Sequence, residues 1–375
     1  MKPKKVLYLH IGMPKTGTSS LQLFLVQNQE VLAKQGFVYP MMPGRYFAVS
    51  PNRNAHFLAG KIKDAQGHED LDQTEQIKKQ SFELLDRTFC NTDNVILSDE
   101  AIWNTYKSGN PECLRSIRTF CEERDIALKL IVYLRRQDYY LESYWKQQIL
   151  KRGVNWSWER MIKKTPKYIV LDYYKHLEVL AKEVGRENIM VQLYYEECFD
   201  LCSDFLRVAG IKLTDEFEPL EEKINLSLNN NYAQIKRILN GVCSEDPVKW
   251  NIEHKWLKRM VIDGSRLEKE QYDSTMFSEE ERRKFLKRFE EVNHKIAREY
   301  MGRDELFDDS MEQSQSLPKW EPDNPLQYED TVAFLGMALL ELKREQEMQR
   351  AQLKQLASGQ RSVFRKVIDK CRSVI

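Results

Sequence analysis

The chain of 375 residues has no long apolar run, no C-x-x-C pair and no excess of one charge. No window approaches the ~20 apolar residues that a membrane-spanning helix needs, so we expect no transmembrane segment. The apolar run at residues 6–11 is too short for the core of a secretory signal peptide. The cysteines number seven and show no paired spacing, which favours reduced thiols in a cytoplasmic protein without a metal site.

The charge balance argues against two further classes of partner. The sequence has 58 basic and 57 acidic residues, which gives a net charge of +1. No strong global field therefore attracts nucleic acid or an anionic membrane. Hydrophobic residues make up 42% of the chain, enough for a globular core.

A glycine-containing turn follows the apolar run at residues 6–11 and opens a helical pattern. Gly12 and Gly17 keep the spacing of the phosphate loop G-x-x-x-x-G-K-[ST], but Thr18 stands where that loop has lysine. The lysine lies three positions earlier, at Lys15. Glycines let the backbone approach a phosphate, and the N–H groups of the turn and the helix N-terminus then face it. Such a turn binds an anion, or it is an ordinary strand–turn–helix junction with a solvated lysine.

The string Pro14-Lys15-Thr16-Gly17-Thr18 resembles the 5′-phosphosulfate loop of the sulfotransferase family, whose donor is 3′-phosphoadenosine 5′-phosphosulfate (PAPS). The longer string at residues 10–22 is similar to bacterial members that modify carbohydrates. This resemblance implies that Lys15 contacts the oxygen that bridges phosphate and sulfate. It also implies that the 5′-phosphate is held by backbone and hydroxyl groups of Thr16, Gly17, Thr18 and Ser19.

A second motif follows the apolar run at residues 128–134. Arg135 comes directly after this run and Ser143 eight residues later, a spacing similar to the 3′-phosphate motif of the same family. The resemblance implies that both residues bind the 3′-phosphate, and a guanidinium with a hydroxyl suits phosphate oxygens. Many relatives have Asn-Pro or Asp-Pro after the arginine, where this chain has Arg136. We expect Arg136 to compensate for this difference or to pair with Asp138.

Sulfuryl transfer to a hydroxyl needs a base for the hydroxyl proton, and two residues are candidates. Glu100 follows the apolar run at residues 94–98 and is either that base or an acid in the first turn of a helix. His56 lies in a polar segment and is either the base or a structural or acceptor-binding histidine. Relatives use a glutamate or a histidine, so the resemblance leaves both open. We expect Asp99 to cap a helix or to support the base.

Short, nearly continuous apolar runs alternate with helical patterns in the first half of the chain. The runs cover residues 6–11, 94–98, 128–134 and 189–194. The helical patterns cover residues 21–34, 72–89, 113–124, 139–151 and 173–184. This alternation predicts an α/β fold, with a P-loop-type parallel sheet flanked by helices on both faces. The first loop, Glu100 and Arg135 then meet at the carboxyl edge of the sheet.

The sequence predicts a helical extension after the sheet. Residues 1–304 are predicted to form the sulfotransferase-like domain, mainly helical from about residue 229. Residues 305–330 are acidic, polar and rich in proline, which predicts a linker. Residues 331–375 predict a final amphipathic helix, which Ser358-Gly359 weakens or ends.

The final helix carries a coiled-coil-like pattern with polar breaks. One heptad position holds Leu335, Leu342, Leu356 and Val363, and the other holds Leu339, Leu353 and Val367. Three functions remain open for this helix. It packs on its own domain, associates with a second copy of the chain, or lies on a membrane surface through its basic end.

The motifs together predict a PAPS-dependent sulfotransferase that acts on a hydroxyl of a carbohydrate or glycoconjugate, with PAPS as co-substrate and no required metal. A nucleotide-dependent sugar or small-molecule kinase of related fold is an alternative. It would need a lysine after Gly17, where Thr18 stands, and a strand-end aspartate for Mg²⁺, which Asp99 could supply. A non-catalytic scaffold that associates through its C-terminal helix is a second alternative and predicts no donor binding.

Overall fold

The computed structural model describes residues 5–44, 46, 49–64, 67–105, 112–168, 170–195, 200–220, 228–267, 270–307 and 317–372, with the backbone alone for 165–168 and 354–372. The chain divides into two compact units. Unit 1 comprises Met1–Trp145, Glu159–Ser227 and Phe277–Ser316, and unit 2 comprises Lys146–Trp158, Leu228–Met276 and Leu317–Ile375. The helical segment 228–276 thus belongs to a different unit from the sheet, whereas the sequence predicted one domain for residues 1–304.

Unit 1 is built on a sheet of five parallel strands in the order β2-β3-β1-β4-β5. The strands are β1 (Val6–His10), β2 (Phe37–Val38), β3 (Asn94–Ser98), β4 (Ala127–Leu134) and β5 (Ile189–Leu193). The four predicted strands are confirmed to within one residue at each end. The edge strand β2 was not predicted, because two residues are too short for an apolar pattern.

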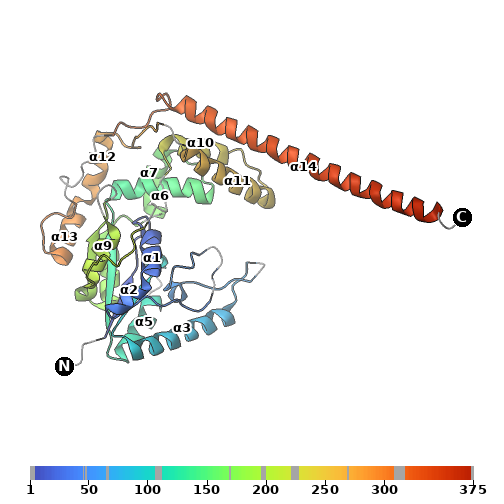
Figure 1. Cartoon of the computed structure of the whole chain (residues 1–375). Coiled ribbons are helices and arrows are strands. Elements are labelled where there is room, and N and C mark those ends of the chain that lie inside the picture. The colour runs from blue at the N-terminus through green and yellow to red at the C-terminus, as the bar shows by residue number, and fades with distance from the viewer. Residues whose placement is uncertain are drawn as a thin grey trace. The chain divides into compact units, whose positions relative to one another are not determined.

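Helices cover both faces of this sheet, as predicted. On one face, α1 (Thr18–Gln27), α2 (Gln29–Lys34) and α9 (Leu201–Ala209) pack in a cluster with Ile96, Ile131 and Tyr133 (Figure 1). The helices of the other face include α3 (Leu71–Asn91), α5 (Glu112–Glu122) and α8 (Tyr173–Val184). Successive strand residues point to opposite faces, and both Leu130 and Ile131 are fully buried. Burial on both faces therefore explains why the strands read as continuous apolar runs.

The remaining elements are helices, which divide between the two units. Unit 1 also contains η1 (His56–Leu58), α4 (Ala101–Thr105), η3 (Arg186–Asn188), α12 (Glu279–Leu286), η4 (Lys287–Phe289) and α13 (Glu290–Met301). The helices α6 (Gln137–Arg152) and α7 (Trp158–Tyr168) each include residues of both units. Unit 2 contains α10 (Asn230–Asn240), α11 (Pro247–Ser265) and α14 (Gln327–Arg372).

The predicted helix at residues 21–34 is divided into α1 and α2. Asn28 lies at the junction, and its side-chain amide donates to the carbonyls of Phe24 at 2.9 Å and Glu218 at 3.0 Å. An asparagine that bonds neighbouring backbone groups offers the chain an alternative to the helical ladder. The break therefore lies at a polar residue whose side chain bonds the backbone, inside an otherwise helical pattern.

The C-terminal part differs from the sequence prediction in two ways. Residues 317–326 pack within unit 2, because Trp320 donates to Asn231 at 2.7 Å and Thr275 to the Pro318 carbonyl at 3.0 Å. The described part of the predicted linker is thus ordered; residues 308–316 lie outside the described residues. Helix α14 begins at Gln327 and continues through Ser358-Gly359 to Arg372, so this pair does not end it. A glycine inside a helix costs only about 1 kcal/mol relative to alanine, too little to stop a 46-residue helix.

Among the residues that the structure describes, no helix is long and apolar enough to cross a membrane.

A buried amide in unit 2 gives a test of this packing. The fully buried Asn231 side chain donates to Asp330 at 2.8 Å and exchanges hydrogen bonds with Asn324 at 3.0 and 3.2 Å. Asn231→Ala should lower the free energy of unfolding by about 2–4 kcal/mol, because it removes several buried hydrogen bonds at once. Denaturant unfolding of the full chain measures this change. The exposed Asn251→Ala on α11 is the control, and equal stability of the two variants would contradict the prediction.

Candidate functional site

The carboxyl edge of the sheet is organised around β1, which pairs with β3 on one side and β4 on the other. The ladder with β4 continues past the end of β1, where Ile11 donates to the Ile131 carbonyl at 3.1 Å and Met13 to the Tyr133 carbonyl at 3.0 Å. The chain leaves β1 toward β2 but leaves β4 toward β5, so these connections run in opposite directions. Ligands of open parallel sheets bind at such a switch point. The first loop and Arg135 both lie there.

The first loop has a backbone that is unusual for its residues. Gly12, Lys15 and Gly17 have φ values of 93°, 72° and 72°, in the left-handed region that favours glycine. The same conformation at Lys15 costs roughly 1–2 kcal/mol, and strained residues of this kind cluster at functional sites. The Thr16 hydroxyl donates inward to the Met13 carbonyl at 2.7 Å. The loop is thus held by an internal hydrogen bond, and the Thr16 hydroxyl has no proton left to donate to a ligand.

The N-terminus of α1 points its backbone toward the same edge. Gly17 is the N-cap, and among the described residues no side chain caps this helix. The first N–H groups of a helix have no partner inside the helix and carry the positive end of its dipole. The backbone of residues 16–19 can therefore bind an anion, as the sequence predicted.

Arg135 joins the first loop to the end of β4. Its side chain is buried, and Nη1 donates to the Lys15 carbonyl at 3.1 Å. The guanidinium carbon lies 5.6 Å from the centre of the Tyr194 ring. The structure therefore brings Arg135 of the second motif to the first loop. Ser143 is buried in the second turn of α6.

Arg136 pairs with Asp138, one of the two alternatives drawn from the sequence. Both carboxylate oxygens of Asp138 accept from the Arg136 guanidinium at 2.8 Å, and Arg282 lies 3.5 Å from the same carboxylate. The Tyr139 ring has both guanidinium groups nearby, at 4.7 and 5.1 Å. Arg136 therefore forms a buried ion pair at the start of α6.

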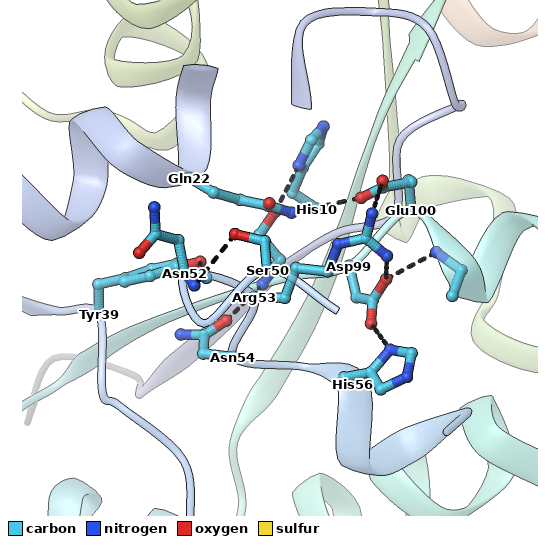
Figure 2. A network of polar contacts seen from close by, with 12 residues as sticks. His10, Gln22, Tyr39, Ser50, Asn52, Arg53, Asn54, His56, Asp99 and Glu100 are labelled. Carbon is cyan, nitrogen blue, oxygen red and sulfur yellow. Dashed lines mark hydrogen bonds and ion pairs between the residues drawn. The ribbon is translucent and has the colours of Figure 1, made fainter. Parts of the chain in front are cut away.

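The end of β3 carries a network of charged side chains (Figure 2). Arg53 forms ion pairs with both Asp99 and Glu100. The Asp99 carboxylate is fully buried; one oxygen accepts from the Ala101 backbone at 2.7 Å, and the other lies 2.5 Å from Nδ1 of His56. Asp99 thus binds the backbone at the start of α4, as the predicted cap would, and it also holds His56, one of the two candidates for the base.

Glu100 lies against the first loop. Its carboxylate is 3.4 Å from the side-chain amide of Gln22 on α1, and a Cβ atom at Gly12 would lie 2.8 Å from the Glu100 Cβ. Burial raises the pKa of Glu100 above its usual value, and the attraction of Arg53 opposes this shift only in part. A carboxyl group with a raised pKa is a stronger base once it has lost its proton.

His56 lies on the other side of Asp99. With Nδ1 bound to a carboxylate, the neutral imidazole has its proton there, and Nε2 carries the lone pair. The Tyr46 ring contacts the imidazole edge at 4.6 Å between ring centres. A Cβ atom at Gly60 would lie 2.5 Å from Nε2, so this position needs glycine to leave room for the ring. His56 is therefore held in one orientation, but no hydrogen bond joins it to the described part of the first loop.

Sequence reasoning missed two members of the network, Arg53 and Gln22. Arg53 belongs to no motif, and its pairing with two carboxylates depends on a contact between distant segments. Gln22 is fully buried on α1 and also contacts the Ser98 hydroxyl, to which His10 bonds at 2.8 Å. Burial lowers the pKa of His10 to about 3, so His10 stays neutral beneath the loop. A polar residue on the apolar face of α1 was the signal that could have identified Gln22.

Comparison with known proteins adds little to this geometry. No protein-family model matches the chain. A curated protein of Archaeoglobus fulgidus, described as an uncharacterized protein, is 31% identical over 217 residues, which are 57% of this chain. The chain matches only 55% of that relative, or about half of its length.

The contact between Gly12 and Glu100 predicts an unequal effect of two similar substitutions. Gly12→Ala should lower the free energy of unfolding by clearly more than the roughly 1–2 kcal/mol that a left-handed alanine costs, since its Cβ would also collide with Glu100. Gly210→Ala is the matched control, with φ of 77° and no atom within 4 Å of the added Cβ. Denaturant unfolding compares the two. Equal losses would show that the loop and Glu100 are not in contact.

Proposed function

We propose that this protein is a sulfotransferase that moves the sulfuryl group of PAPS to a hydroxyl of a carbohydrate or glycoconjugate. The observation that supports it most is the hydrogen bond from Arg135 to the Lys15 carbonyl. It puts a guanidinium group, which suits phosphate oxygens, beside the turn at the start of α1 and at the switch point of the sheet. A donor with phosphates at both the 3′ and 5′ positions needs two phosphate-binding features close together, here the loop and the guanidinium.

The chain offers a role for each group at this edge. The backbone N–H groups of residues 16–19 would bind the 5′-phosphate, with the hydroxyls of Thr18 and Ser19 but not that of Thr16. Arg135 and Ser143 would bind the 3′-phosphate. Lys15 would stabilise the negative charge that develops on the bridging oxygen as its bond to sulfur breaks and the acceptor oxygen bonds to sulfur.

We assign the base to Glu100 rather than His56. Glu100 borders the first loop and α1, where the acceptor hydroxyl has to approach, and its pKa is raised by burial. It would take the proton of the acceptor hydroxyl during transfer. His56 and Asp99 would then position Arg53, which contacts both carboxylates and orients Glu100.

The contacts of Asp99 bear on the kinase alternative. A kinase would use Asp99 to hold Mg²⁺, but both oxygens of that buried carboxylate are bound by Arg53, Ala101 and His56.

The described cysteines are free thiols, as a reducing compartment favours, and we propose a cytoplasmic location.

Donor binding can be tested without knowledge of the acceptor. Adenosine 3′,5′-bisphosphate at about a hundred times its dissociation constant should raise the melting temperature by roughly 5 °C, from about 2.7 kcal/mol of linkage. ADP with Mg²⁺ should give no comparable shift. Arg135→Ala should remove most of the effect, while Arg207→Ala, an exposed arginine of the same unit, should retain it. A preference for ADP with Mg²⁺ would support the kinase instead, and no response to either nucleotide would support the scaffold.

The identity of the base follows from a pH profile of kcat. In the wild type, kcat should rise with pH as Glu100 loses its proton, with a midpoint above the ordinary glutamate pKa, because only the ionised carboxylate accepts a proton. Glu100→Gln should lower kcat about 10²- to 10⁴-fold and remove this dependence, with unchanged affinity for the bisphosphate. His56→Ala should retain the dependence with a smaller loss. The reverse pattern would identify His56 as the base.

A further inference from the structure

Helix α14 has one face that packs on its own unit. Phe334 and Ala338 are buried where α14 contacts α10 and α11, and Glu341 forms an ion pair with Arg259 of α11. These positions recur at intervals of three or four residues, as expected for one side of a helix. This packing covers only the first turns of α14.

A second apolar stripe lies on a different side of the same helix. Leu335, Leu339, Leu342 and Leu353 are 52%, 67%, 48% and 65% exposed. Their spacing alternates between four and three residues, with Gln346 and Gln349 at the two intervening positions. In the sequence, Leu356, Val363 and Val367 continue the same spacing. A stripe of this period over more than three heptads is the signature of a coiled coil.

The exposed part of α14 is also long for a helix without a partner. Every side chain from residue 342 to residue 353 is exposed. Isolated helices gain little from intrinsic propensity, and most helical stability in proteins comes from the packing of an apolar face. Four large leucines in water along one stripe therefore indicate that another surface covers them.

We propose that residues 335–353 of α14 form a parallel two-stranded coiled coil with the same residues of a second copy of this chain. In this arrangement Leu339, Gln346 and Leu353 occupy a positions, and Leu335, Leu342 and Gln349 occupy d positions. The same helix of the second copy supplies a matching stripe, and each glutamine amide pairs with the same glutamine of that copy. Polar pairs inside such a seam fix its register at some loss of stability.

The charges beside the stripe favour the parallel orientation. Glu345 falls at a g position and Arg350 at the e position of the next heptad, so each Glu345 faces Arg350 of the other copy. Lys343 and Arg350 occupy successive e positions. An antiparallel pair would bring e positions against e positions and so oppose like charges.

The mass of the full chain in solution tests the proposal. Sedimentation of the wild type should give the mass of two chains, and Leu342→Lys with Leu353→Lys should give the mass of one. These side chains are exposed within one chain, so the variant should keep the folded core of both units, and its circular dichroism should lose at most the helical signal of the exposed part of α14. Leu340→Lys is the matched control, because Leu340 is 56% exposed but lies outside the stripe, and it should retain the mass of two chains. A wild type with the mass of one chain, or a double variant with the mass of two, overturns the proposal.

A charge exchange tests the orientation. Glu345→Lys should weaken the dimer roughly tenfold, since it replaces two attractive pairs by two repulsive ones, and adding Arg350→Glu should restore it. Glu347→Lys, the same change outside the stripe, should have little effect. Failure of the second change to restore affinity overturns the parallel arrangement. Binding of a single-chain wild type to anionic vesicles would assign the stripe to a membrane surface and overturn the proposal.

Discussion

β1 is hydrogen-bonded to β3 along one side and to β4 along the other, and these two ladders place the first loop, the pair Asp99-Glu100 and Arg135. Because the strands are parallel, their carboxyl ends meet at one edge. The first loop, the pair Asp99-Glu100 and Arg135 are therefore neighbours although more than 100 residues of chain separate the first from the last. The first loop contacts the residues that follow both neighbouring strands: Gly12 lies against Glu100 after β3, and the Lys15 carbonyl accepts a hydrogen bond from Arg135 after β4. A change of register by one residue would separate these contacts.

The site combines positively charged groups at the first loop with two carboxylates after β3. Lys15 belongs to the first loop, where the phosphates of a donor would bind, and Arg135 and the N-terminus of α1 border it. The two carboxylates after β3 are balanced by Arg53, so that Asp99 remains fully buried without an uncompensated charge. Burial nevertheless raises the pKa of Glu100. This arrangement suits a reaction that neutralises a leaving oxygen on one side and removes a proton on the other.

The sequence predicted the sheet well, because strands buried on both faces leave continuous apolar runs and their ends mark the site. It also placed Lys15, Glu100 and Arg135 at one edge. It did not predict Arg53 or Gln22, since their partners are distant in the chain and no local pattern reports such a contact. The role of Arg136 stayed open until its geometry with Asp138 was known. Ser358-Gly359 does not end the helix, one of the two effects that the sequence left open, because the penalty of one glycine is small beside the length of α14.

A crystal structure of the protein with adenosine 3′,5′-bisphosphate tests the central claim most directly. The account predicts the 5′-phosphate within hydrogen-bond distance of the backbone N–H groups of residues 16–19. It predicts the 3′-phosphate on the guanidinium of Arg135, with the Glu100 carboxylate facing the open side of the loop. A nucleotide bound elsewhere, or bound at the loop with its 3′-phosphate away from Arg135, would contradict the account.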